Sequence, residues 1–293
     1  MNDKINALNA YKKKLQTIGL IYTISAILCI LLIFKFRTVG IALFFVLAAF
    51  HVFVFKRMIR SFREQVKTAI LEEGFRPFIK DITYQKKDGL SPAEVSAMQF
   101  LPAWHKDRIL VRDTIRGTYQ AMPVVLTDLT TDFQSSAPGK NGVRKDTVDF
   151  LSGCLLDIQL SGDSGADYLL LPKNLFNAPT LKHYLDAKEQ AAFEEVAFVG
   201  DLAGQFLLYT SPENDKPEIP KEFAKAILRL AEFTPGQTMV QVSGDHLRIF
   251  IRNRFLYTYS FLLRTEITSK LLSSNPLPEL PYMTRVADAL LHP

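Results

Sequence analysis

Apolar and charged positions are distributed unevenly along the 293 residues of this chain. Residues 18–34 contain no charged side chain, and neither do residues 38–55. These runs of 17 and 18 residues make helices about 26 Å long, close to the roughly 30 Å thickness of a bilayer's hydrocarbon core. Because only residues 35–37 join them, we expect two antiparallel transmembrane helices that form a hairpin over residues 18–55.

Two other structures fit part of this pattern. A secretory signal peptide would explain Lys12–Lys14 ahead of the first run. However, that run is long, no small-residue cleavage site follows it, and a second apolar run begins almost at once. A buried helical hairpin is disfavoured because two charge-free runs of this length are hard to cover with so small a domain. The transmembrane hairpin remains the expected structure.

The charged residues predict how this hairpin is oriented. Residues 1–69 hold 11 Lys and Arg but two acids, a net charge of +9, whereas the other 224 residues hold 24 basic and 28 acidic side chains, a net charge of −4. Basic residues beside transmembrane helices stay in the cytoplasm and attract anionic lipid headgroups. We therefore expect both termini, including the basic segment 1–17, to be cytoplasmic, with the lipid bilayer as a partner. The acidic remainder disfavours a nucleic-acid partner, which requires a broad basic surface.

Helical periodicity continues beyond the second apolar run. Four apolar residues recur at every fourth position between basic side chains: Met58, Phe62, Val66 and Ile70. This pattern predicts an amphipathic helix over residues 56–73, ended by Gly74. Three partners fit its apolar stripe: the soluble domain that follows it, the membrane surface, or a second copy of the chain in a homo-oligomer. The stripe is therefore a candidate interaction surface.

Residues 74–293 have the composition of a soluble domain with short strands and interspersed helices. The clearest signals are a capping box at Ser91 and Glu94, which starts a short helix, and a β-hairpin over residues 238–251 that turns at Gly244-Asp245. Further helices are expected at residues 221–233, 281–291 and around 264–272. Further strands are expected at residues 107–113, 121–131, 147–160, 166–171, 194–199 and 204–210. This mixture predicts an α+β fold with a mainly antiparallel sheet, and we expect the domain to fold without the hairpin.

Turn-forming residues predict three of the connections in this domain. Arg116-Gly117 indicates a turn between the first two strands. Residues 135–146, which are rich in Ser, Pro, Gly and Asn, indicate an exposed hairpin loop. Residues 161–165 indicate a turn between the next two strands.

Few residues of this domain suggest catalysis. Gly162–Gly165 matches the Gly-Asp-Ser-Gly of trypsin-like proteases, which makes Asp163 and Ser164 candidates, but no segment carries the oriented base that such a nucleophile needs. His105, beside the only tryptophan, is a third candidate, although such a segment more often anchors a connection to the core. Cys154 lies in an apolar strand, so we expect a buried structural thiol rather than a pair with His183.

Ligand-binding patterns are also missing from the sequence. No Gly-rich phosphate loop and no metal-ligand spacing occurs, so we expect neither a cofactor nor a metal. His51 lies within the second apolar run, where a histidine can relay protons. Neither apolar run offers it a carboxylate partner. We therefore expect His51 to face a neighbouring helix or to approach the interface.

The order of segments across residues 56–272 resembles the bacterial family catalogued as domain of unknown function 3137. The stretches that carry the resemblance are Ile70–Glu73, Leu90–Glu94, Phe100–Arg108, Arg112–Gly117, Phe150–Cys154, Leu169–Pro172, Phe206–Ser211 and Phe223–Leu230. The resemblance implies two N-terminal membrane spans ahead of one α+β domain, in the inner membrane of a bacterium. It brings no catalytic signature, and it implies a LemA-type protein as a genetic neighbour.

Two functions follow from these patterns. The first is a non-enzymatic, membrane-anchored cytoplasmic module that binds, scaffolds or regulates an unidentified protein partner, because no catalytic cluster is visible and the charge excess lies around the hairpin. The second is a membrane-associated enzyme of hydrolase type with an unrecognised active site near His105 or near Asp163 and Ser164. We expect the first.

Overall fold

The computed structural model describes residues 1–87, 89–96, 98, 109–139, 142–174, 194–197, 200–210, 218–256 and 266–292, with residues 132–139 and 142–151 described by their backbone alone. The chain divides into two compact units. Residues 1–75 and 266–276 form the first, which we call the helical unit. Residues 76–256 and 277–292 form the second, which we call the sheet unit.

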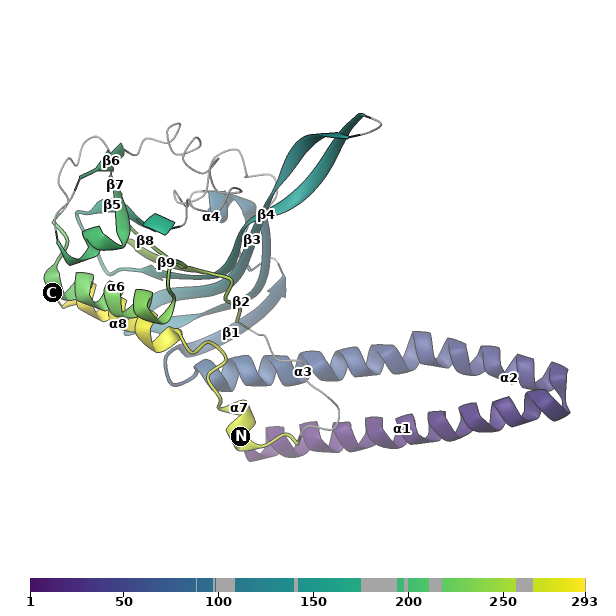
Figure 1. Ribbon diagram of the computed structural model, residues 1–293. Coiled ribbons are helices and arrows are strands. Elements are labelled where there is room, and N and C mark those ends of the chain that lie inside the picture. Colours follow the sequence, from purple (N-terminus) through teal and green to yellow (C-terminus); the bar gives the residue numbers. More distant parts are fainter. Residues whose placement is uncertain are drawn as a thin grey trace. The chain divides into compact units, whose positions relative to one another are not determined.

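Two long helices make up most of the helical unit (Figure 1). One is α1 (Asn2–Lys35), and the other is a continuous helix made of α2 (Arg37–Phe50), a π-helical turn η1 (His51–Phe55) and α3 (Lys56–Phe75). Of the most apolar 18 residues in each, only 6% and 11% are buried, unlike the core helices of soluble proteins. Both helices are therefore long and apolar enough to cross a membrane.

Small and aromatic side chains hold the two apolar helices together. A Cβ added to Gly40 would lie 2.5 Å from the backbone nitrogen of Ile33, so only glycine permits this approach. The thiol of Cys29 donates to the Gly40 carbonyl at 3.6 Å. One π-helical turn at His51 brings its ring to 5.1 Å from that of Tyr22 on α1. His51 thus faces the neighbouring helix, one of its two expected environments.

The apolar stripe of α3 packs within the chain. Phe62, Val66 and Ile70 are fully buried and Met58 is half-buried. The ring of Phe62 meets that of Tyr11 on α1 edge to face, at 5.5 Å between centroids. Segment 1–17 is thus a helix that pairs with α3, a partner outside the three that the sequence suggested.

Residues after the sheet return to the helical unit. Helix α7 (Ser269–Leu272) contacts α3, and Asn9 of α1 donates to the Ile267 carbonyl at 3.0 Å. Helix α3 runs to Phe75, so the expectation that Gly74 ends it is wrong. A Cβ on Gly74 would lie 2.5 Å from the Ser274 carbonyl oxygen. Glycine is needed here for close packing of residues 266–276, which do not belong to the unit of residues 76–256.

Gly74→Ala should therefore destabilise the helical unit by about 1–3 kcal/mol, because the added methyl forces a backbone shift that outweighs the better helix propensity of alanine. Gly204→Ala is the control, since a Cβ there has nothing within 4 Å. Thermal unfolding of the full chain in detergent would check this. Equal unfolding temperatures for the two variants would contradict the close approach.

The sheet unit contains nine antiparallel strands in the order β1-β2-β3-β4-β9-β8-β5-β7-β6 within the described part of the chain. They are β1 (Lys80–Lys87), β2 (Ile109–Tyr119), β3 (Met122–Gly139), β4 (Gly142–Gln159), β5 (Asp167–Pro172), β6 (Glu194–Val196), β7 (Phe206–Thr210), β8 (Thr238–Ser243) and β9 (His246–Arg252). The helices are α4 (Pro92–Ser96), the 3₁₀ turn η5 (Asp201–Gly204), α6 (Lys221–Phe233) and α8 (Leu280–Leu291). The predicted α+β class with an antiparallel sheet is confirmed.

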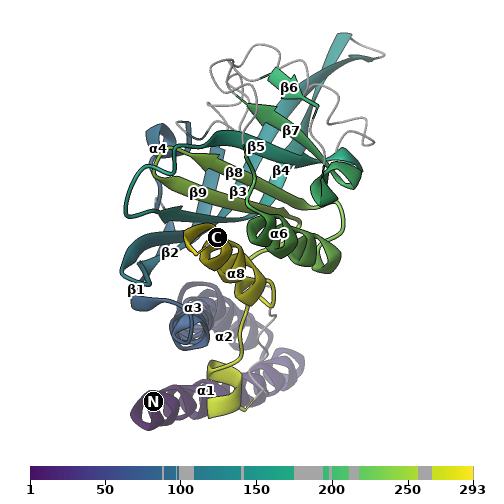
Figure 2. The same cartoon turned by 90° about the vertical axis from the view of Figure 1, so that its left-hand side faces the viewer.

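Both faces of the sheet are covered. Side chains alternate between faces along a strand, so Leu155 and Phe250 point to one face and Leu156 and Ile249 to the other. The first face packs against the α4 segment in one apolar cluster: Leu90, Val95, Met98, Leu129, Leu155, Leu169, Leu171, Tyr209, Met239 and Phe250. Helices α6 and α8 lie side by side on the opposite face (Figures 1 and 2).

Two local predictions are confirmed at atomic detail. The capping box before α4 forms, because Glu94 N–H donates to Ser91 Oγ at 3.2 Å and Ser91 N–H donates to the Glu94 carboxylate at 2.6 Å. The hairpin β8–β9 turns at Gly244-Asp245, with Gly244 at φ 58°.

Two predicted turns are wrong. Strand β2 continues through Arg116-Gly117, and the chain reverses at Gln120-Ala121, both of which have positive φ. Ile79 and the Lys80 carbonyl lie against Gly117, so there is no room for a larger residue at this position. The loop expected over residues 135–146 is instead a continued β3–β4 ladder, in which Ser135 pairs with Asp146.

Candidate functional site

Polar side chains interrupt the apolar face of the sheet on three neighbouring strands. Arg248 on β9 lies opposite Asp157 on β4 and opposite Gln241 on β8. Two residues away along β9, His246 lies opposite Gln159 on β4. Because the register aligns them, these side chains project from the same face, next to the apolar cluster around α4.

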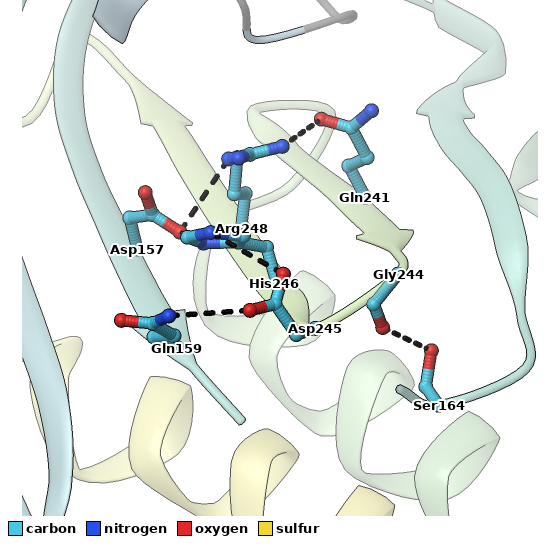
Figure 3. A network of polar contacts seen from close by, with 8 residues as sticks. All are labelled: Asp157, Gln159, Ser164, Gln241, Gly244, Asp245, His246 and Arg248. Atoms are coloured by element: carbon cyan, nitrogen blue, oxygen red, sulfur yellow. Dashed lines mark hydrogen bonds and ion pairs between the residues drawn. The ribbon is translucent and has the colours of Figure 1, made fainter. Parts of the chain in front are cut away.

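Asp157 is the centre of a polar network (Figure 3). Its Oδ1 lies 2.8 Å from His246 Nδ1 and 3.4 Å from Arg248 Nε. A carboxylate only accepts, so His246 donates from Nδ1. Arg248 Nη1 also donates to Gln241 Oε1 at 3.3 Å. Asp157 and Arg248 are each only 11% exposed at the side chain, so each charge depends on the other for compensation.

The β8–β9 turn adds a second carboxylate to this network. Asp245 Oδ2 accepts from Gln159 Nε2 at 3.2 Å, and its Oδ1 lies 3.6 Å from His246 Nε2. The hydrogen bond from Gln159, helped by the nearby His246 and Arg248, lowers the pKa of Asp245. His246 therefore lies between two carboxylates.

A pocket of ≈ 350 Å³ opens beside the network. Its walls come from the α4 segment and from strands β2, β3, β4 and β9: Leu90, Glu94, Met98, Arg116, Pro123, Val125, Asp157, Gln159, His246 and Arg248. Opposite the Asp157 network, Arg116 donates to the Gly89 carbonyl at 2.5 Å and pairs with Glu94 at 3.3 Å. Hydrogen bonds from Ser91 are the largest cause of the lowered pKa of Glu94, so its carboxylate is held ionised against Arg116.

The Gly162–Gly165 motif lies in the connection between β4 and β5. Residues 161–166 do not turn between neighbouring strands, because β9 and β8 lie between β4 and β5. Ser164 Oγ donates to the Gly244 carbonyl at 2.8 Å, and Asp163 Oδ1 accepts from Gly165 N–H at 2.9 Å. Ser164 thus fastens this connection to the β8–β9 turn. The third candidate, His105, lies outside the described residues.

Ser164→Ala should leave the protein's function intact and cost less than about 1 kcal/mol, the net worth of one exposed hydrogen bond. A serine nucleophile would instead be indispensable. Complementation of a deletion strain, with protein levels checked by immunoblot, measures the difference. Loss of function at normal abundance would return Ser164 to the candidate catalytic residues.

Sequence reasoning missed Asp157, His246 and Arg248 as a group. The available signal was their spacing, since polar residues stand at alternate positions in otherwise apolar strands, as in Asp157 and Gln159 or His246 and Arg248. That spacing does not indicate which strands pair. Asp157 on β4 and His246 on β9 are 89 residues apart along the chain, and only the fold brings them together.

The network supplies part of a catalytic apparatus. A carboxylate that orients a histidine prepares that histidine to act as a general base. None of the described residues that line the pocket is a serine, threonine, cysteine or lysine that could serve as its nucleophile. Within the described ranges, no three His, Cys, Asp or Glu side chains are grouped to hold a metal ion.

No family model, no curated protein and no solved structure matches this chain significantly.

Proposed function

We propose that this protein is a membrane-anchored module in the inner membrane of a bacterium, whose sheet unit binds a partner protein on the cytoplasmic side. The two apolar helices supply location, and the family resemblance supplies the bacterial setting and a LemA-type protein as a candidate partner. The sheet unit supplies recognition through the pocket beside Asp157.

The chemistry of the pocket carries this proposal. Its charges are arranged as pairs, Arg248 with Asp157 and Arg116 with Glu94, next to apolar walls from Leu90, Met98, Pro123 and Val125. At ≈ 350 Å³ it is at the small end of ligand sites, which run from roughly 300 to 1,000 Å³. A single anchoring side chain of a partner, with polar atoms for the rim, fits such a site.

A photo-crosslinking residue at position 159 of the full chain tests this proposal in native membranes. Gln159 is exposed at the pocket, whereas Lys173 is exposed outside it and serves as the matched position. We expect a discrete protein adduct from position 159 and none from position 173. Arg116→Glu should weaken the adduct, because it reverses a charge in the pocket without removing a buried group.

An adduct of equal strength at both positions, or none at position 159, would reject the pocket as a binding site for a partner protein.

The orientation has its own test. Both termini should be cytoplasmic, because the basic residues Lys12–Lys14 and Lys56–Arg63 flank the apolar helices on one side. Alkaline phosphatase fused after Pro293 should be inactive and a fluorescent protein there should be bright. The reverse pattern would place the sheet unit outside the cytoplasm.

A second function, a membrane-associated hydrolase, is favoured by one observation, the His246–Asp157 hydrogen bond beside the pocket. His246→Gln removes the base but keeps a polar side chain. If complementation fails in His246→Gln at normal abundance and survives in Arg116→Glu, the enzyme is the better proposal. If complementation fails only in Arg116→Glu, the binding module is the better proposal.

A further inference from the structure

A second hollow of ≈ 400 Å³ is lined by residues of α6 and α8. These two helices lie on the opposite face of the sheet from the α4 segment (Figure 2). The small side chains of Ala226 and Ala289 leave space between the two helices. Basic residues from both helices line it: Lys225, Arg229, Arg285 and His292. We call this hollow the α6–α8 groove.

The two acids that line the groove are already engaged. Glu222 pairs with Lys225 at 2.6 Å. Asp288 accepts hydrogen bonds from Tyr119 Oη at 2.6 Å and from Gln120 Nε2 at 2.8 Å. Burial and the hydrogen bond to Asp288 raise the pKa of Tyr119 to about 12, so this hydroxyl remains a donor at neutral pH. The Asp288 carboxylate is thereby used to hold the strained Gln120-Ala121 turn.

Arg229 and Arg285, by contrast, are exposed and make no ion pair within the part of the chain that the structure describes. The guanidinium of Arg285 lies over the ring of Tyr282, 5.8 Å from its centroid. Two guanidinium groups whose donors face solvent at one groove form a receptor for a phosphate, which arginine binds through two parallel hydrogen bonds.

An apolar contact borders the same groove. Phe233 is 44% exposed and stacks on Tyr282 at 4.9 Å between ring centroids. Among the described residues of the sheet unit, only Leu110 is another large apolar side chain with comparable exposure. An aromatic pair beside two arginines suits a ligand that carries both an anionic head and an organic portion.

We propose that the α6–α8 groove binds an organic phosphate through Arg229 and Arg285, with Phe233 and Tyr282 against its organic part. Two sources share this chemistry: a phospholipid headgroup of the bilayer that anchors the chain, and a soluble phosphate ester. Tethering favours the first, because an anchored domain meets headgroups at high effective concentration and needs little intrinsic affinity. This site is independent of the pocket beside Asp157.

The full chain in lipid nanodiscs separates the two sources. In the soluble arm, glycerol 3-phosphate is titrated into nanodiscs of phosphatidylcholine and followed by phosphorus NMR. In the lipid arm, hydrogen exchange of residues 221–233 and 280–291 is compared between nanodiscs of phosphatidylcholine and nanodiscs that also contain phosphatidylglycerol. Binding or protection in either arm is the expected result and identifies the source.

The variant Arg229→Ala/Arg285→Ala should weaken the observed binding about 30-fold, the effect of losing two basic contacts to an anionic headgroup. Lys80→Ala/Lys173→Ala removes the same charge from exposed positions outside the groove and should leave binding unchanged. No response in either arm, or an equal loss in both double variants, would overturn the proposal.

Discussion

Asp157→Ala should destabilise the sheet unit by about 3 kcal/mol, one of the two largest effects expected of a change in this protein. The substitution leaves Arg248, 11% exposed, without its carboxylate partner, and it also removes the acceptor of His246. Breaking a buried ion pair from one side costs roughly 3–5 kcal/mol, since the remaining charge is desolvated and uncompensated. Urea unfolding of the full chain in detergent, followed by circular dichroism, would measure this loss.

The double variant Asp157→Leu/Arg248→Met separates charge from packing. Removing both charges leaves none unpaired, so most of the stability should return. If the double variant is as unstable as Asp157→Ala, the ion pair is not what the site depends on, and the loss comes from shape alone. If neither is destabilised, the Asp157 side chain is solvated rather than engaged with Arg248.

The second large effect is expected in the helical unit. Phe62 and Val66 are fully buried, so Phe62→Asp/Val66→Asp forces two carboxylates into the contact between α3 and α1. The cost should be several kcal/mol, more than the helical unit can lose. The chain should be degraded and its level in membranes should fall severalfold.

Ser61→Asp/Gln65→Asp provides the matched control. It places the same two charges on the same helix at exposed positions and should leave membrane levels unchanged. Immunoblots of the two double variants in one strain give the comparison. Normal levels of Phe62→Asp/Val66→Asp would mean that the stripe does not pack against α1.

Local sequence signals determined most of the elements. The capping box at Ser91 and Glu94 and the turn at Gly244-Asp245 each satisfy backbone groups within a few residues, so they form wherever the chain folds. Gln120-Ala121 shows the limit. This turn needs positive φ at both residues but lacks the usual Asn or Gly, and contacts of Tyr119 and Gln120 with Asp288, far along the chain, support it.

Glycine is required either for a positive φ or for the close approach of another segment, and the sequence alone does not distinguish these two roles. Gly74 and Gly117 were expected at a helix end and in a turn, where positive φ favours glycine. Both lie instead inside regular elements, where another segment approaches the backbone too closely for a side chain. The partners of that approach, Ser274 and Ile79, belong to segments whose placement only the tertiary fold determines.

The candidate site was beyond sequence reasoning for the same reason. Asp157 is a polar residue in an apolar strand until β9 pairs with β4 and brings His246 and Arg248 beside it. The contact between α1 and α3 in the helical unit was likewise not predicted from the sequence. Segment 1–17 reads as a basic terminus, yet Leu8 and Leu15 are buried and Tyr11 meets Phe62.

The division of the chain between its two units has a consequence for proteolysis. The polypeptide passes from the helical unit to the sheet unit after Phe75, returns before residues 266–276, and passes back again after Pro276. Three covalent connections therefore join the units, where a simple anchored domain has one. A protease that cuts once, after Phe75, leaves the sheet unit attached, because residues 266–276 of the same fragment still pack against α1 and α3. Release of residues 76–256 from the anchor also requires a cut ahead of residues 266–276, and the product then loses α8 and with it one wall of the α6–α8 groove.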